Sequence, residues 1–409
     1  MNARRLAQWS WALSAWANHG FMTTVAVGLF PIYFDRYLGA TLSGERQTLY
    51  LGATNSAATF IVMLIAPWLG ALADRRASKK RWLMGWTVAG SLACAVLSGI
   101  DPAHWSWALL VYGVASVSFW AGSSFQDALI VEVADTHEVN RISSLGFALG
   151  YVGGGLLFLI NVLLATHPAW FHLGNATEAT RVAFRDVAVW WLLFTLPLFW
   201  WVSEPPPSAR PSGLRELWAT IRHIAADRAV RNFLLAYWLY IDAINTVQLM
   251  AVDFGTKLGF SSDALIKALL LVQFIAFPFA LLFGRLGDYF GVKRSIYLGL
   301  AVFAGVTCYA YFMHSETQFY VLAAVFGTVQ GGVQALSRSY FVGLIPRERA
   351  GEYFGFYNML AKFAAVLGPL AMGVVAFATG NQRLSILVLE FFFIGGALLL
   401  ARVPMPHER

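Results

Sequence analysis

A face of polar side chains lies within the apolar segment 231–255. Trp238, Asp242 and Asn245 recur at i, i+4 and i+7, so a helix places them on one side. Counted from the start of the segment, Asp242 lies roughly 16 Å along the helix axis, near the midplane of a bilayer. A carboxyl group there suits a proton carrier or an anchor for a substrate amine, because burial opposes its ionisation. The structural alternative is an acid whose hydrogen bonds are satisfied by a neighbouring helix.

Three further apolar segments, 9–34, 105–131 and 317–341, also carry polar residues at helical spacing. Each has amides, hydroxyls or aromatic rings on one face: Trp11, Ser14 and Asn18; Trp120, Ser123, Ser124 and Asp127; Gln330, Gln334 and Ser337. Asp127 is nearer the cytoplasmic end of its segment and adds a second titratable group. The amides suit hydrogen bonds to a substrate, and they equally suit bonds between helices.

The composition decides what kind of element holds these faces. The 409-residue chain is 58% hydrophobic and 12% charged, so it has too few polar residues to cover a water-soluble globule. A helix needs roughly 20 residues to cross about 30 Å of hydrocarbon. The sequence offers twelve such runs, near 9–34, 49–73, 82–100, 105–131, 142–166, 184–203, 231–255, 264–284, 294–313, 317–341, 352–378 and 382–403. We therefore predict an all-α integral membrane protein with twelve transmembrane helices, because backbone polar groups in lipid must be paired within the segment.

The scarce cations are concentrated beside the ends of these runs. Five of the seven residues from Arg75 to Arg81 are basic, in a chain of formal net charge +7. Lys and Arg near helix ends stay on the cytoplasmic side, and the N-terminus and the loops after every second run hold most of them, which predicts that both termini are cytoplasmic. A nucleic-acid surface needs a soluble domain to carry it, and none is predicted. The run from Trp9 to Phe34 is long enough to remain as the first span, so no cleaved signal is expected.

No cofactor, metal or catalytic centre is expected. Cys94 and Cys308 both fall inside predicted spans, which indicates neither a disulfide framework nor a metal site. No nucleophile motif, paired His and Asp, or ATP-binding motif occurs, so the chain is not expected to be an enzyme. Gly146, Gly150 and Gly154 recur every four residues, which predicts a packing surface between helices rather than a phosphate-binding loop.

A polar linker divides the chain into two halves. Pro205 to Pro207 and Pro211 end the sixth run, and 214–224 has apolar residues at helical spacing with arginines on the other side. This pattern is typical of a short helix on the inner membrane surface. We predict three parts: an N-terminal six-helix bundle at 1–203, a cytoplasmic linker at 204–230 and a C-terminal six-helix bundle at 231–409.

The two halves repeat one loop. GALADRRASKKR at 70–81 follows the second run and GRLGDYFGVKRS at 284–295 follows the eighth, which aligns Asp74 with Asp288. The pattern Gly-x-Leu-x-Asp-Arg before a basic cluster resembles the loop between spans 2 and 3 of the major facilitator superfamily. Within that superfamily, WANHGF, SSLGFALGYVGGGLL, GGVQALSRSYFVGLIP and GEYFGFYNMLAKFAAVLGPL look like the vacuolar amino-acid effluxer-like family.

The resemblance implies a major facilitator fold of two six-helix bundles in which spans 1, 4, 7 and 10 line a central cavity. The substrate-binding candidates on those spans are Asn18, Trp120, Ser124, Trp238, Asp242, Asn245, Gln330 and Gln334. Asp242 and Asp127 are the candidates for proton coupling, although the family usually has an amide where this chain has Asp127. The candidates for a cytoplasmic gate or latch are Asp74, Arg75, Asp288, Arg338 and Lys362. The alternatives are that the cluster after Asp74 only fixes orientation and that Lys362 reaches to the inner membrane surface.

We therefore expect a secondary active transporter that moves a small organic solute by alternating access, with proton coupling. The resemblance implies an amino acid or a related amine or peptide-like compound. The expected partners are the solute, protons and the lipid bilayer, and a monomer in the cell inner membrane is expected. A multidrug or metabolite efflux pump and a membrane sensor that binds solute without moving it stay open as alternatives. The sequence offers no interpretation of Glu390 in the last span.

Overall fold

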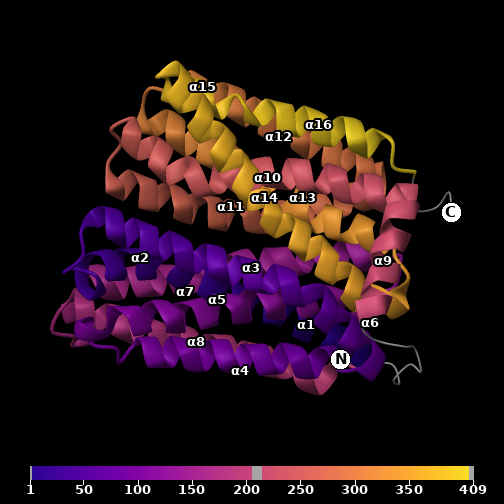
Figure 1. The fold of residues 1–409 in the computed structure, drawn as a ribbon, viewed down its shortest axis with the longest axis horizontal. Helices are drawn as coiled ribbons and strands as arrows, with labels where there is room; N and C mark the ends of the chain where they lie inside the picture. The colour runs from indigo at the N-terminus through magenta and orange to yellow at the C-terminus, as the bar shows by residue number, and fades with distance from the viewer. Residues whose placement is uncertain (1, 205–213, 405–409) are drawn as a thin grey trace. The chain divides into compact units, whose positions relative to one another are not determined.

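The computed structural model describes residues 2–204 and 214–404, and helices make up nearly all of this part of the chain (Figure 1). Every predicted span is helical, and no strand occurs among the described residues. Contacts divide the chain into two units. The N-unit comprises Met1–Val133 and Leu149–Arg210, and the C-unit comprises Ala134–Ala148 and Pro211–Arg409.

The N-unit begins with a helix that changes its winding along its length. Helix α1, Ala3–Gly20, continues through the π-helical segment Phe21–Leu29, helix α2, Phe30–Tyr33, and a second π-helical segment, Phe34–Leu38. The other helices are α3, Gly44–Arg76; α4, Lys79–Leu97; α5, Trp105–Ala128; α6, Ile130–Val133; α7, Val139–Thr166; and α8, Ala176–Trp201. Helix α7 is shared, because its first residues, up to Ala148, belong to the C-unit.

The C-unit contains the linker helix and the last six spans. Its helices are α9, Leu214–Ala226; α10, Arg228–Lys257; α11, Ser262–Phe290; α12, Val292–Tyr311; α13, Glu316–Val342; α14, Ala350–Thr379; α15, Gln382–Ile386; and α16, Leu389–Ala401. The predicted linker helix is present as α9, and the last predicted span is divided into α15 and α16. The linker prolines Pro205 to Pro207 and Pro211 lie outside the described residues.

Local sequence signals set the ends of the helices. Asn175 begins α8 by accepting a hydrogen bond from the Glu178 N–H at 2.9 Å. Ser315 and Gln318 form a reciprocal capping box at the start of α13. Gly291 has a φ of 88°, which a residue without a side chain adopts at low cost, and it separates α11 from α12. These turns explain why the predicted span limits agree with the structure to within several residues.

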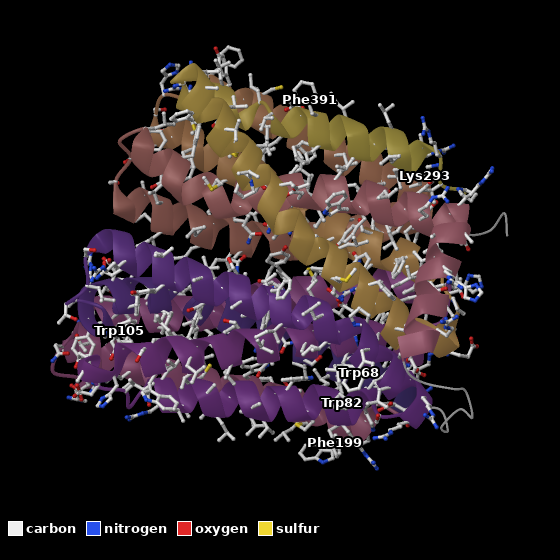
Figure 2. The ribbon with its side chains drawn as sticks, in the orientation of Figure 1. Trp68, Trp82, Trp105, Phe199, Lys293 and Phe391 are labelled. Carbon is white, nitrogen blue, oxygen red and sulfur yellow. The ribbon has the colours of Figure 1, made fainter. Side chains whose placement is uncertain are left out.

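The outer surface is apolar, as a bilayer requires. Phe377 is 93% exposed and Phe391 is 76% exposed, and Figure 2 shows Phe391 projecting outward from α16. Among the described residues, seven segments are long and apolar enough to cross a membrane: Leu49–Arg76, Pro102–Val133, Val139–Thr166, Ala176–Trp201, Ala264–Phe290, Glu316–Val342 and Arg383–Ala401.

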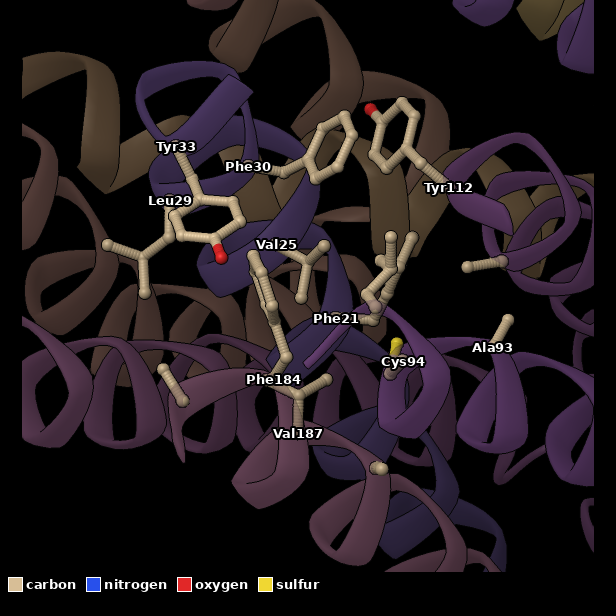
Figure 3. Close-up of a cluster of buried hydrophobic side chains, with 14 of the residues drawn as sticks. Phe21, Val25, Leu29, Phe30, Tyr33, Ala93, Cys94, Tyr112, Phe184 and Val187 are labelled. Carbon is tan, nitrogen blue, oxygen red and sulfur yellow. The ribbon is translucent and has the colours of Figure 1, made fainter. Parts of the chain in front are cut away.

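Aromatic stacking and small residues pack the N-unit. Phe30 stacks on Tyr112 with ring centroids 4.0 Å apart, within a cluster that draws side chains from α1, α2, α4, α5 and α8 (Figure 3). A Cβ atom at Gly150 would lie 2.7 Å from His19, and one at Gly154 would lie 2.7 Å from Thr23. This close approach confirms the predicted packing surface at these two glycines of α7.

Candidate functional site

The acid predicted as the main functional residue is buried inside the C-unit. Asp242 lies in α10 and is 1% exposed. Its Oδ1 accepts hydrogen bonds from the backbone N–H of Gly368 at 3.1 Å and from the Thr246 hydroxyl at 3.4 Å. Its Oδ2 has no hydrogen-bond partner in the described part of the chain. One carboxyl oxygen is therefore fixed against α14, and the other has unused hydrogen-bonding capacity.

Glycine at position 368 is what permits this contact. A Cβ atom there would lie 2.0 Å from the Thr246 Oγ1 and 3.0 Å from the Asp242 Oδ1. Neither Gly368 nor Thr246 was predicted as a site residue. The available sequence signal was the Gly-Pro pair at 368–369 inside an otherwise apolar run, since such a pair often marks a broken helix.

Further polar groups of the C-unit keep unused hydrogen-bonding capacity. The Gln330 amide of α13 donates from Nε2 to Oε1 of Gln248 on α10 at 2.9 Å. The buried Gln330 Oε1 and the Trp238 indole N–H have no partner among the residues described. Gln334 of α13 and Asn245 of α10 are partly buried. The structure therefore joins the predicted polar faces of spans 7 and 10 through one amide pair.

The amide predicted on the first span of the N-unit, that of Asn18, forms hydrogen bonds to two other helices. Asn18 donates to Oε1 of Gln126, and its Oδ1 accepts from the Trp191 indole N–H at 2.6 Å. Trp11 donates its indole N–H to the Gln126 backbone carbonyl at 2.7 Å. These bonds connect α1, α5 and α8. Asn18 therefore forms hydrogen bonds between helices, as one of the two interpretations of its amide expects. Its role in substrate binding stays a prediction.

The remaining candidates of span 4 lie along α5. Ser124 turns its hydroxyl back to the Trp120 carbonyl at 3.2 Å, which is a bond within its own helix. Trp120 packs edge-on against Phe119, with ring centroids 4.5 Å apart. Asp127 is partly buried near the end of α5. Their predicted roles in substrate binding and proton coupling stay predictions.

The acid of the first repeated loop pairs with a lysine of the same loop. Lys79 Nζ lies 3.1 Å from Asp74 Oδ1 and 2.9 Å from Glu132 Oε1, and Lys79 is 3% exposed. Burial lowers the pKa of Lys79, but the charges and hydrogen bonds of the two carboxylates outweigh it, and the pKa is raised above the usual 10.5. Arg75, the other latch candidate here, is exposed.

A second acid joins this loop to the end of α8. Glu204 accepts hydrogen bonds from the backbone N–H groups of Lys79 and Lys80, each at 2.8 Å. In return, Lys80 donates to the carbonyls of Phe199 and Val202. A carboxylate at the N-terminus of α4 and an ammonium group at the C-terminus of α8 are both favourable to the helix dipoles. Sequence reasoning missed Glu204, although an acid next to the proline run was visible.

The second repeated loop contacts the first turns of α7 within the C-unit. Asp288 accepts from the Asn140 amide at 2.8 Å. Arg338 donates from Nε to the Ser143 hydroxyl at 2.9 Å and from a terminal nitrogen to the Ser143 carbonyl at 2.8 Å, and it lies over the Phe147 ring. Asn140 and Ser143 were not predicted as site residues. The side chain of Lys362 lies outside the described part of the structure.

The unexplained acid of the last span has partners on a neighbouring helix. Oε1 of Glu390 accepts from the Thr307 hydroxyl and from the Cys308 thiol of α12. A polar contact of this kind connects helices α12 and α16. Among the described residues, no group of three His, Cys, Asp or Glu side chains is placed to hold a metal ion.

Comparison with known proteins identifies the family. Residues 3–409 match the family model described as vacuole effluxer Atg22 like. The chain belongs to the Atg22-like family. It is 36% identical to the uncharacterized MFS-type transporter YxiO of Bacillus subtilis over 97% of this chain and 94% of that protein. It is 26% identical to autophagy-related protein 22 of Yarrowia lipolytica over 75% of this chain and 58% of that protein.

Solved structures show the fold of this Atg22-like protein. The human organic anion transporter MFSD10 superposes with a TM-score of 0.79 at 16% identity, covering 98% of this chain and all of that chain. The major facilitator transporter FucP in its outward conformation superposes with a TM-score of 0.77 at 11% identity, covering 99% of this chain and all of that chain. These superpositions show the major facilitator fold of twelve helices, and together with the family match and the 36% identical MFS-type transporter they identify a multi-pass membrane transporter.

Proposed function

We propose that this Atg22-like transporter carries a small organic solute in exchange for, or together with, protons, and that Asp242 carries the proton. The supporting observation is a carboxyl group that is 1% exposed in the middle of α10, with one oxygen held by Gly368 and Thr246 and the other without a described partner. An intramembrane acid in this environment is a functional candidate by default.

Opposing influences on the Asp242 carboxyl group support this role. Burial favours the neutral form, while the Gly368 and Thr246 donors favour the charged form. None of the described Lys or Arg side chains forms an ion pair with it, so no fixed cation holds it in the charged state. A carboxyl group under opposing influences of this kind can gain and lose a proton as its surroundings change.

We propose an amino acid or a related amine as the solute. The unbonded Oδ2 of Asp242 suits a protonated amine, and the amide oxygen of Gln330 and the indole N–H of Trp238 offer one further acceptor and one donor. The family description names its members as vacuole effluxers, which agrees with a transported solute. We also propose that both termini lie in the cytoplasm, as the distribution of Lys and Arg predicts, and that the protein is a monomer in the cell inner membrane.

We further propose that contacts around the two repeated loops form the cytoplasmic gate. Within the C-unit, Asp288 with Asn140 and Arg338 with Ser143 connect α11 and α13 to the start of α7. A few hydrogen bonds of this kind are together strong enough to favour one conformation of the transporter, and each is weak enough to break during a transport cycle. In the N-unit, Asp74, which aligns with Asp288 in the repeated loop, forms an ion pair with Lys79.

Reconstitution into liposomes tests the proton proposal. A thermal-shift screen of amino acids, amines, drugs and dyes identifies a ligand, because ligands that bind the folded state raise its apparent stability. The ligand is then assayed for accumulation driven by a pH gradient and for counterflow without one. We expect Asp242→Asn to lose gradient-driven accumulation and to keep counterflow.

The control is Asp186→Asn, which changes another partly buried acid, in α8, that has no proposed role. We expect it to behave as the wild type. Normal gradient-driven accumulation by Asp242→Asn would reject the proposal. A ligand that binds but shows no counterflow would indicate a sensor, and a broad response to dyes and drugs would indicate an efflux pump.

A further inference from the structure

Helix α14 carries a proline, Pro369, in its interior. Proline has no backbone N–H, and its ring displaces the carbonyl four residues earlier, so the hydrogen-bond ladder of the helix is weakened there. Directly before the proline, Gly368 donates its N–H to Oδ1 of Asp242 at 3.1 Å. A carboxylate therefore contacts the main chain of α14 at the place where that helix is weakest.

The contact is tight and specific to glycine. A Cβ atom at position 368 would lie within 3.0 Å of both Thr246 and Asp242, so any other residue would push α14 away from α10. Thr246, one turn along α10 from Asp242, donates to the same carboxyl oxygen. The backbone of α14 is thus in direct contact with the carboxyl group of Asp242.

We infer that Gly368 is a positioning residue for the proton step and that the bend of α14 at Gly368–Pro369 follows the charge of Asp242. An ionised carboxylate accepts a charge-assisted bond from the Gly368 N–H and holds the two helices together at this point. A neutral carboxyl group accepts a weaker bond, so the half of α14 after the proline, 370–379, is released to move. The inference rests on the proposed function, since it takes Asp242 as the proton carrier.

Other described charges do not substitute for Asp242 in this contact. Charged side chains that the structure describes also lie within the spans that pack against α10. Arg338 is bonded to Ser143, Glu352 to Arg349 and Glu390 to Thr307, and Lys267 of α11 is exposed. The tyrosines on or against α10 also have other partners: Tyr357 of α14 stacks on Tyr237, Tyr340 of α13 stacks on Phe233, and Tyr240 of α10 is bonded to Ser337. Asp242 is therefore the described titratable group that contacts the backbone of Gly368 directly before Pro369.

A small apolar cavity lies beside α14. This cavity of the C-unit is lined by Met372, one turn after Gly368, and by Val247 and Met250 of α10. Closely packed interiors resist displacement of their elements, whereas a cavity lined by flexible methionine side chains yields. The side chains around Met372 can therefore adjust when the bend of α14 changes.

Distance measurements between spin labels test this inference without requiring substrate. Labels are attached at Phe377→Cys on α14 and Phe312→Cys at the end of α12, two exposed positions of the C-unit, in a protein carrying Cys94→Ala and Cys308→Ala. Double electron–electron resonance is recorded in liposomes between about pH 5 and pH 8, a range in which a buried carboxyl group titrates. We expect the distance to shift with pH, and Asp242→Asn to hold it at its acidic value throughout.

Two variants of α14 and one control test the role of Gly368 and Pro369. We expect Gly368→Ala to lose the pH-dependent shift because it separates α14 from Asp242. Pro369→Ala restores a helical N–H and should reduce the shift, which keeps the test open where Gly368→Ala fails to fold. Pro278→Ala, which changes an interior proline of α11, should leave the shift unchanged.

The outcomes separate this inference from the proposed function. A distance that does not change with pH, in a protein whose proton-driven accumulation depends on Asp242, overturns the inference and leaves the proposed function intact. A shift that persists in Pro369→Ala and in folded Gly368→Ala also overturns it. Normal proton-driven accumulation in Asp242→Asn rejects the proposed function itself.

Discussion

Replacing Lys79 by Met should destabilise the N-unit by a predictable amount. Lys79 is 3% exposed and lies within 3.1 Å of two carboxylates, those of Asp74 and Glu132, whose side chains are also mostly buried. Methionine has a similar length but no charge, so both carboxylates would stay buried without their cation. Removing one partner of a buried ion pair costs about 3–5 kcal/mol. For a unit of this size that cost lowers the unfolding midpoint by roughly 6–20 °C.

The assay is thermal unfolding in detergent, followed by tryptophan fluorescence. The control is Arg81→Met, an exposed neighbour in the same loop, which should change the free energy of unfolding by about 0.5 kcal/mol or less. Adding Asp74→Asn and Glu132→Gln to Lys79→Met should recover most of the lost stability, because no uncompensated charge remains. A loss no larger in Lys79→Met than in Arg81→Met would refute the reasoning.

The same cluster predicts the sign of a pH effect. The carboxylates raise the pKa of Lys79 above 10.5, so the stabilisation from its charge is complete below that pH and is lost as the pH rises through the folded-state pKa. The difference in stability between the wild type and Lys79→Met should therefore be constant near neutral pH and should shrink above about pH 10.5. A difference that grows with alkaline pH contradicts this assignment.

Two other substitutions test contacts that sequence reasoning left open. Asn18→Leu leaves the Gln126 amide oxygen and the Trp191 indole N–H without their bonds to Asn18, which should cost about 1–3 kcal/mol of stability for each group. A lower unfolding midpoint with unchanged KM supports the interhelical role. A raised KM with unchanged stability contradicts it. Glu390→Gln keeps an oxygen acceptor for Thr307, so the free energy of unfolding should change by about 0.5 kcal/mol or less. The pH dependence of transport should be that of the wild type. An altered pH profile would make Glu390 a proton carrier.

The sequence alone was enough to predict the fold class, the twelve spans and the family. Length and composition of the apolar runs required helices, since a bilayer offers no other partner to backbone polar groups. The repeated loop and four further motifs identified the superfamily and the family, both of which the comparisons confirm. Helical spacing also identified the glycines of α7 as a packing surface, because contact between helices depends on small residues at that spacing.

The partners of each polar residue were decided by the tertiary structure. Helical spacing assigned Asn18 and Asp242 to polar faces, but it did not distinguish a substrate contact from a contact between helices. Asp242 meets Gly368, 126 residues away, and Asn18 meets Trp191, 173 residues away. These pairs depend on the rotation and axial position of one packed helix against another, and these are set by the combined shapes of many side chains rather than by any local pattern.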